Sequence, residues 1–475
     1  MKLVSNILVV CLFLFAVGCG TQKPPNVLFI AIDDLNDSID MLDGNLSVKT
    51  PAMDELASRG TLFTNAHCSS PACNPSRTSL LTGVRASSSG VYENMQNWRE
   101  CTNLEGKPTL PEYFKSQGYK TIGGGKLFHA HSFTRKALSG FPHPEAWDEY
   151  YPSKDQQMPA EVWPENWPVN SFKKLYGGHF DWGAMDIDDA EMGDAKVVAW
   201  AEKQLSQQHD GPVFMTVGIY RPHVPWYVPN KYFDMHPLEE TALPTVMEGD
   251  LDDVPPVGQK FARVSWQKWM VDNGKWREAV QSYRASVSFA DEMVRRVIEA
   301  LDNGPLAENT IVVLWSDHGY HLGVKQHWEK FALWEQTTRV PIIIATPDGI
   351  GAGSRTSRPV SLLDLYPTLM DLCGLPAPAH LEGQSLTPLL ADPEALPGRV
   401  AVMTHIFNNH AVRSDRWRYI RYADGSEELY DHDNDQYEWH NLAGQPKYAD
   451  VINEHKRWLP KDNAEHNPPV KRRGN

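Results

Sequence analysis

Two kinds of hydrophobic pattern alternate along most of this chain. Continuous apolar runs of strand length occur at Val27 to Ile32, Val213 to Ile219, Ile311 to Trp315 and Pro341 to Ala345. Runs without polar alternation are typical of strands that are covered on both faces. Amphipathic segments with helical spacing lie between them, at Ala195 to Leu205, Trp276 to Leu301 and Leu362 to Leu372. Buried strands that alternate with helices predict an α/β domain with a large doubly wound sheet.

The pattern changes after about Pro397. Short strand-like runs follow, at Ala401 to His405, Trp417 to Arg421 and Glu428 to Tyr430, with Asp424-Gly425 as a hairpin turn and a closing helix at Val451 to Leu459. We therefore expect a main domain over residues 25–396, a small C-terminal α+β subdomain over 397–460 and a frayed tail over 461–475. The stretch from Phe141 to Asp181 is rich in Trp and Pro and has no period, which predicts a long ordered loop region.

The first 19 residues have the pattern of an export signal. Lys2 precedes the apolar stretch Ile7 to Val17, which is too short for a comfortable membrane span. The small residues before Cys19 resemble a bacterial lipoprotein processing site, after which that cysteine would be lipidated. Ala16 stands where such sites usually have Leu, so a plain cleaved signal is the alternative. We expect an exported protein in the periplasm or on the cell surface, with no membrane contact beyond a lipid on Cys19.

Charge and cysteine content narrow the classes of partner. The chain has 475 residues, 41% of them hydrophobic, and a net charge of -15. Such an acidic chain lacks the basic face that nucleic acid requires, so we expect no nucleic-acid partner. An anionic substrate would need a local cationic pocket.

Outside the signal and position 73, the cysteines are Cys68, Cys101 and Cys373. Their spacing matches no zinc site, and they form either one disulfide or three buried thiols.

The run from Cys73 to Gly83 predicts an anion-binding helix entrance. Pro75 and Ser76 suit the first turn of a helix, and Gly83 suits its end. Cys73 would then lie among the unpaired backbone N–H groups at the positive end of the helix dipole. Arg77 adds a fixed positive charge that can bind an oxyanion through two nitrogens.

Two acidic clusters follow separate predicted strands. Asp33 and Asp34 come directly after one strand, and Asp317 and His318 come directly after another. Ligands of open α/β sheets gather beyond the carboxyl ends of the strands, and carboxylates brought together there repel one another unless a cation lies between them. Oxygen ligands suit a hard ion, so we expect Ca²⁺, with Mg²⁺ as the alternative because a histidine is less usual for calcium.

Three further segments supply cationic and proton-transferring side chains. They contain Lys126 and His129, His223, and Lys330, and each segment lies shortly after a predicted strand or after the Asp-His cluster. His321 has no such placement, and we expect it to be structural.

The chain resembles the type I sulfatases of the alkaline-phosphatase superfamily, most nearly those similar to iduronate-2-sulfatase. The resemblance spans Asn26 to about Leu442 and includes Cys73-Asn74-Pro75-Ser76-Arg77, Gly125-Lys126-Leu127-Phe128-His129, Arg221-Pro222-His223 and Ser316-Asp317-His318-Gly319. It implies an alkaline-phosphatase-like fold and oxidation of Cys73 to formylglycine by a formylglycine-generating enzyme or an anaerobic sulfatase-maturating enzyme. It also implies a metal site formed by Asp33, Asp34, Asp317, His318 and the oxidised Cys73.

The same resemblance implies a role for each cationic or proton-transferring residue. A hydroxyl of the hydrated aldehyde would attack sulfur, while Arg77, Lys126 and Lys330 neutralise the sulfate. His223 or Lys330 would protonate the leaving sugar oxygen, and Lys126, His223 and Lys330 would bind the substrate. His129 would remove the second hydroxyl's proton and expel sulfate.

The resemblance points to a sulfated glycan that contains uronic acid as the substrate. It would be cut at a chain end if the Trp-rich stretch from Phe141 to Asp181 closes one side of the pocket. Two alternatives remain at this stage. One is a phosphoester or phosphonate hydrolase of the same superfamily, and the other is a glycan-binding surface lipoprotein with an inactive site.

Overall fold

The computed structural model describes residues 23–44, 46–130, 140–170 and 180–469. The predicted signal at residues 1–19 and the last six residues of the predicted tail lie outside the described residues. No helix of the described part is both long and apolar enough to cross a membrane.

A mixed sheet forms the centre of the molecule, with nine strands within the described ranges. Its strand order is β12-β2-β11-β8-β1-β6-β3-β4, and β13 pairs with β2 further along that strand than β12 does. The strands are β1 Asn26–Ile32, β2 Thr61–His67, β3 Lys120–Gly125, β4 Glu149–Tyr151, β6 Val213–Ile219, β8 Thr310–Ser316, β11 Arg339–Ala345, β12 Ser354–Thr356 and β13 Val360–Ser361. Two small pairs lie apart from it, β5 Trp182–Met185 with β7 Trp226–Pro229, and β9 His321–Leu322 with β10 Trp328–Glu329.

The central strand β1 runs parallel to both of its neighbours. Val27 lies beside Phe214 of β6 and Ile311 of β8, and Ile32 at its other end lies beside Ile219 and Ser316. Every residue of β1, β6 and β8 is buried, as their unbroken apolar runs predict. Because these strands are parallel, their carboxyl ends meet at one edge of the sheet.

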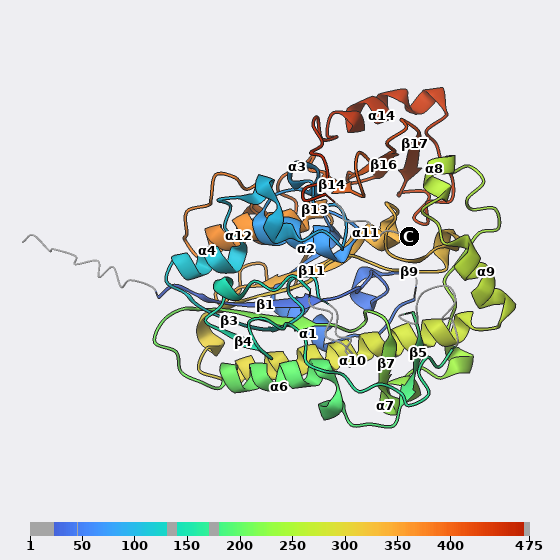
Figure 1. Cartoon of the computed structure of the whole chain (residues 1–475). Coiled ribbons are helices and arrows are strands. Elements are labelled where there is room, and N and C mark those ends of the chain that lie inside the picture. Colours follow the sequence, from blue (N-terminus) through green and yellow to red (C-terminus); the bar gives the residue numbers. More distant parts are fainter. Residues whose placement is uncertain (1–22, 45, 131–139, 171–179, 470–475) are drawn as a thin grey trace, which may run out of the picture.

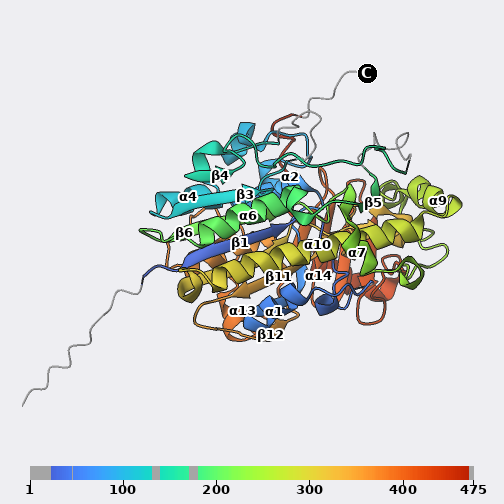
Figure 2. The same cartoon turned by 90° about the horizontal axis from the view of Figure 1, so that it is seen from below.

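Helices cover both faces of the sheet (Figures 1 and 2). One face packs against α1 Pro51–Arg59, α6 Gly193–Leu205 and the long α10 Trp276–Asp302. The other packs against α2 Cys73–Thr82, α4 Leu110–Ser116, α12 Leu365–Leu372 and α13 Thr387–Ala391. The doubly wound α/β fold is therefore confirmed. The remaining α-helices are α3 Ala86–Ser89, α7 Asn230–Asp234, α8 Pro256–Gln259, α9 Val264–Asp272, α11 Glu335–Thr338 and α14 Ala449–Lys456.

One predicted helix starts later than its pattern indicates. Residues 362–364 form a 3₁₀ turn, and the α-helix begins only at Leu365. Pro367 explains the difference, because its ring would clash with the carbonyl four residues earlier if the α-helix began at Leu362. The Ser361 side chain accepts a hydrogen bond from the Leu363 N–H and so caps the 3₁₀ turn.

A four-stranded antiparallel sheet follows the main domain and lies on one side of it, together with α14 (Figure 1). Its strands are β14 Ala401–Thr404, β15 His410–Arg413, β16 Trp417–Arg421 and β17 Glu427–Asp431. The sequence pattern missed β15, a four-residue strand bounded by two polar residues.

The expectation of a frayed tail is wrong for residues 461–469. The Ala464 N–H donates to the Ser87 carbonyl at 2.7 Å, and the Gln96 amide donates to the Pro468 carbonyl at 2.9 Å. The hydroxyl of Tyr92 donates to the Ala464 carbonyl at 2.7 Å. This segment is ordered because a polar surface distant in sequence supplies partners for its backbone.

Candidate active site

The N-terminus of α2 places Cys73 beside the carboxyl ends of β1 and β8. Cys73 is the first residue of the helix and is fully buried, and Gly83 ends the helix with a left-handed φ of 70°. The Asn74 N–H in the first turn donates to the side chain of Asn94 at 2.9 Å. The Ser76 hydroxyl donates to the Asp317 carbonyl at 2.6 Å, which fixes the helix entrance against the end of β8.

The predicted metal ligands lie together around Cys73. Ligand atoms of Asp33, Asp34, Cys73 and His318 all lie within 4.8 Å of one another, and all four residues are buried. His318 Nε2 is 3.3 Å from Cys73 Sγ and 3.5 Å from Asp34 Oδ1. Asp317 Oδ2 lies next to this group, 3.6 Å from His318 Nε2. Residues as far apart in sequence as Asp33 and His318 therefore form one cluster.

Asp34 carries the clearest indication that the cluster suits a cation. Its Oδ2 is buried and accepts no hydrogen bond from any described residue. A buried carboxylate oxygen without a partner is costly, and a bound cation would satisfy it. The carboxylate and imidazole groups in the cluster are suitable ligands for a divalent ion.

Arg77 anchors both acidic clusters. Its Nε donates to Asp317 Oδ2 at 2.7 Å and its Nη2 to Asp33 Oδ1 at 3.3 Å. Its Nη1 donates to the backbone carbonyl of Lys126 at 2.6 Å, so the same side chain also holds the β3 end in place. Arg77 is therefore the positioning residue of the cluster in this structure.

Two lysines complete the cationic pocket. Lys126 Nζ forms an ion pair with Asp33, and Lys330 Nζ donates to Asp34 Oδ1 at 2.7 Å and to Cys73 Sγ at 3.1 Å. Both lysines are almost fully buried. The two lysines and Arg77 balance the three carboxylates of the acidic clusters, and the Lys330 ammonium lies next to the Cys73 side chain, where an anionic group can bind.

The two aspartates after β1 differ in their proton affinity. Burial raises the pKa of Asp34 to about 8, although Lys330 opposes the shift. Burial acts on Asp33 in the same direction, but Lys126 and Arg77 outweigh it and hold the pKa of Asp33 well below its usual range. Cationic neighbours therefore keep one of the two carboxylates charged.

Two histidines border the same cluster. His223 Nε2 lies 3.9 Å from Asp34 Oδ2, and its Nδ1 faces the Val224 carbonyl at 2.6 Å. Burial, with help from Lys126, moves the pKa of His129 well below its usual value. His129 is therefore held as a neutral imidazole.

All the predicted site residues come together, and some of their support was not predicted. The sequence offers no signal for the Asn94 contact with α2, because Asn94 lies in a loop 20 residues further on. Tyr220 was also missed, and its ring lies 5.1 Å from Lys126 Nζ and 4.6 Å from the His223 ring. His321 was expected to be structural and is not part of the cluster.

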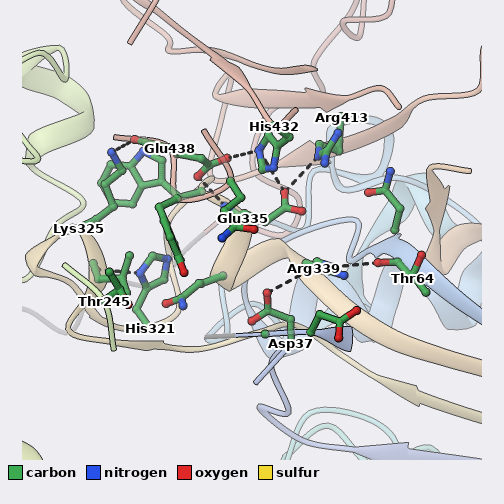
Figure 3. Close-up of a pocket in the computed structure, with 18 of the residues that line it drawn as sticks. Asp37, Thr64, Thr245, His321, Lys325, Glu335, Arg339, Arg413, His432 and Glu438 are labelled. Atoms are coloured by element: carbon green, nitrogen blue, oxygen red, sulfur yellow. Dashed lines mark hydrogen bonds and ion pairs between the residues drawn. The ribbon is translucent and has the colours of Figure 1, made fainter. Parts of the chain in front are cut away.

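A second group of possible ligands lines a cavity of about 350 Å³ between the main domain and the C-terminal sheet (Figure 3). Ligand atoms of Glu335, His432 and Glu438 lie within 4.8 Å of one another there. However, Arg413 Nε is 3.3 Å from Glu335 Oε2, and Arg418 Nε is 2.6 Å from Glu438 Oε1. Because arginines already neutralise these carboxylates, the group is a buried ion-pair network that joins the two domains.

Comparison of the sequence with known families gives two matches. A family described as Sulfatase matches residues 25–375, and one described as N-sulphoglucosamine sulphohydrolase, C-terminal, matches residues 323–465. A protein of Formosa agariphila named "Sulfatase" is 41% identical over 93% of this chain and 87% of its own length. Iduronate 2-sulfatase of Mus musculus is 30% identical over 76% of this chain and 71% of its own length.

Solved structures share the fold at lower sequence identity. One, solved in complex with its substrate D-glucosamine-2-N,6-O-disulfate, has a TM-score of 0.70 and 21% identity over 92% of this chain and 96% of that chain. The phosphonate monoester hydrolase of Agrobacterium radiobacter also has a TM-score of 0.70, with 22% identity over 91% of this chain and 94% of that chain.

Proposed function

This chain belongs to the sulfatase family and is a sulfuric ester hydrolase, and we propose that it removes sulfate from a carbohydrate through oxidised Cys73 and a divalent metal. The observation that carries this proposal is the buried cluster of Asp33, Asp34, Cys73 and His318 at the N-terminus of α2. The orphaned Oδ2 of Asp34 supports a metal there. We propose Ca²⁺, with Mg²⁺ as the alternative, held by these residues and Asp317.

In this mechanism, residue 73 supplies the nucleophile after its thiol has been converted to a hydrated aldehyde. The bound cation would lower the pKa of a hydroxyl and so make it nucleophilic near neutral pH. The Sγ position of Cys73 stands where that hydroxyl would lie, 3.1 Å from Lys330 Nζ. Lys330 and Lys126 would bind the sulfate oxygens, while Arg77 keeps the carboxylates in place.

Proton transfer falls to groups at the edge of the cluster. His223 or Lys330 would protonate the leaving sugar oxygen. His129, neutral because burial lowers its pKa, would take the proton of the second hydroxyl as sulfate leaves. The second hydroxyl lets the aldehyde re-form without attack of water on sulfur, a route that a serine at position 73 would lack.

We place the substrate among sulfated glycans that contain uronic acid, cut at a chain end. The similarity to iduronate 2-sulfatase over 76% of this chain supports the sugar class.

We also propose export through residues 1–19, a lipid on Cys19, and maturation by a formylglycine-generating or anaerobic sulfatase-maturating enzyme. Labelling with a fatty-acid analogue in cells, with Cys19→Ala as control, tests the anchor.

The test of the function compares p-nitrophenyl sulfate with p-nitrophenyl phosphate as substrates of the protein produced with a maturase. We expect sulfate hydrolysis that is lost on chelation by EDTA, restored by Ca²⁺ or Mg²⁺, and absent from Cys73→Ala. Mass spectrometry of the peptide that contains residue 73 should show the aldehyde. Full activity of Cys73→Ala would refute the mechanism, and a strong preference for phosphate would favour a phosphoester hydrolase. An unmodified thiol without turnover would favour a glycan-binding protein with an inactive site.

A further inference from the structure

A groove of about 670 Å³ lies between the main domain and the segment that follows α14. It is lined by the start of α3, the loops at residues 382–384 and 396–400, and residues 458–462. It begins beyond the C-terminal end of α2, whereas the candidate active site lies at the N-terminus of that helix. Ten helical residues span about 15 Å, so the two sites are separate.

Trp458 is the most conspicuous residue of this groove. This residue is 49% exposed, and it is the most exposed aromatic residue of the described chain. Leu459, which follows it, is buried in the core between α14 and the C-terminal sheet. The chain therefore anchors Leu459 inward and holds the exposed indole of Trp458 in the lining of the groove, where it can pack against a ligand.

Around the indole, the groove offers fixed polar groups without an excess of charge. Arg85 Nη2 donates to the Glu382 carbonyl at 3.3 Å, and Arg399 Nη1 donates to Gln384 Oε1 at 3.1 Å. The charged residues of the lining are three cations and three anions, namely Arg85, Arg399, Lys461, Asp364, Glu382 and Asp462. Such a lining presents both donors and acceptors and favours neither an anion nor a cation.

Ser87 provides an independent indication of a ligand. This residue lines the groove and is 1% exposed, and its Oγ has no hydrogen-bond partner among the described residues. The backbone of Ser87 is held in place, because its carbonyl accepts the Ala464 N–H at 2.7 Å. A buried hydroxyl without a partner costs free energy that a ligand hydroxyl would recover.

We propose that this groove binds a sugar segment of a polysaccharide by its neutral face. One pyranose ring packs its C–H face on the Trp458 indole, and its hydroxyls bond to the arginine, carboxylate and amide groups of the rim and to Ser87 Oγ. A lipid would cover the charged rim without forming hydrogen bonds to it, and for an anion the attraction of the three cations would be opposed by the three carboxylates. The contacts in the groove do not depend on the proposed function, but the choice of sulfated polymers as probes rests on it.

Affinity electrophoresis of the full chain tests the proposal. Native gels would contain ulvan, carrageenan or heparan sulfate, each also in chemically desulfated form. We expect at least one polymer to retard the protein, equally well after desulfation, and Trp458→Ala to weaken the binding about fivefold or more, as truncation of a buried Trp contact does. Trp458→Phe should retain most of the binding, and Val271→Ala, which changes an exposed residue of α9 outside the groove, should bind as wild type does.

Each result has a defined meaning. No retardation in any gel, or unchanged retardation of Trp458→Ala, would overturn the proposal. Loss of retardation on desulfation would also overturn it, because the groove would then recognise sulfate. Hydrolysis of p-nitrophenyl sulfate reports the proposed function separately and should be the same in Trp458→Ala and wild type.

Discussion

Lys330 joins Cys73, the proposed nucleophile, to Asp34, one of the proposed metal ligands. Its ammonium contacts both Cys73 Sγ and Asp34 Oδ1, and the side chain is almost fully buried. A preformed cation at this position stabilises negative charge on a transferring group without reorganisation of solvent. The contribution of Lys330 to catalysis should therefore exceed that of any surface lysine.

We expect Lys330→Ala to lower kcat for p-nitrophenyl sulfate by about 100-fold to 1,000-fold, the usual effect of removing one such donor. Lys268→Ala is the matched control, because Lys268 is exposed and pairs with Asp272 in the same helix. Steady-state kinetics measure both variants. A kcat within twofold of wild type for Lys330→Ala would exclude the assigned role.

Asn94 holds the entrance of α2 from a distant loop, and its contribution can be measured. Its Oδ1 accepts the Asn74 N–H, one of the donors that the helix itself cannot satisfy. Asn94→Ala should lower the free energy of unfolding by about 1 kcal/mol, as loss of a helix cap does. Asn97→Ala removes a similar bond at an exposed 3₁₀ turn and should have less effect. Equal shifts of the urea midpoint in the two variants would contradict this view.

Buried ion pairs between short elements join the main domain to the C-terminal sheet. Glu335 of α11 pairs with Arg413 of β15 and Arg418 of β16, and Arg418 also pairs with Glu438. All four side chains are largely buried, so each partner is needed to compensate the desolvation of the others. The network therefore specifies how the two domains dock.

Arg418→Met should destabilise the protein by about 3–5 kcal/mol, because it removes an arginine partner from two buried carboxylates, Glu335 and Glu438. Arg295→Met is the control, since Arg295 is exposed and pairs with Glu292 and Glu299 on the surface of α10, where such pairs contribute about 1 kcal/mol or less. Thermal unfolding monitored by circular dichroism compares the two variants. Similar Tm shifts would show that the network adds no more than a surface pair.

The sequence pattern predicts the elements that contain the site better than the contacts between them. The two central strands could be predicted directly, because Val27 to Ile32 and Ile311 to Trp315 are unbroken apolar runs followed by polar residues. Their parallel pairing then brings Asp33 and Asp317 together. Three features could not be predicted: the strand β15, the docking of residues 461–469, and the arginines around Glu335. Each depends on partners far away in sequence, which local patterns do not encode.

The molecule as a whole should be sensitive to acid because it buries neutral histidines. Burial lowers the pKa of His405 to about 3 and that of His321 to about 4, from an ordinary value of 6.5. In the unfolded chain both accept a proton below about pH 6.5. Because the pKa of each histidine is lower in the folded chain than in the unfolded chain, protonation favours unfolding. The contribution of these histidines to stability is therefore complete above about pH 6.5 and is lost as the pH falls toward 4.

We therefore expect Tm to fall as the pH decreases from 6.5 to 4, measured by differential scanning fluorimetry in matched buffers. His405→Gln should flatten part of this dependence, because glutamine does not titrate and can fill the space between Phe261 and Phe331. An unchanged slope in this variant would show that other groups control the response to acid.

The direction of β1 also determines which end of the sheet lies next to a group attached to the chain before Lys23. The Asn309 side chain binds the Pro24 carbonyl at the edge of the sheet where β1 and β8 begin, and Cys73 lies at the opposite edge. The seven residues of β1 separate these edges by about 20 Å. A tether fixed before Lys23, whether a lipid in a bilayer or a tag on a bead, would thus be attached at the end of the sheet opposite to Cys73.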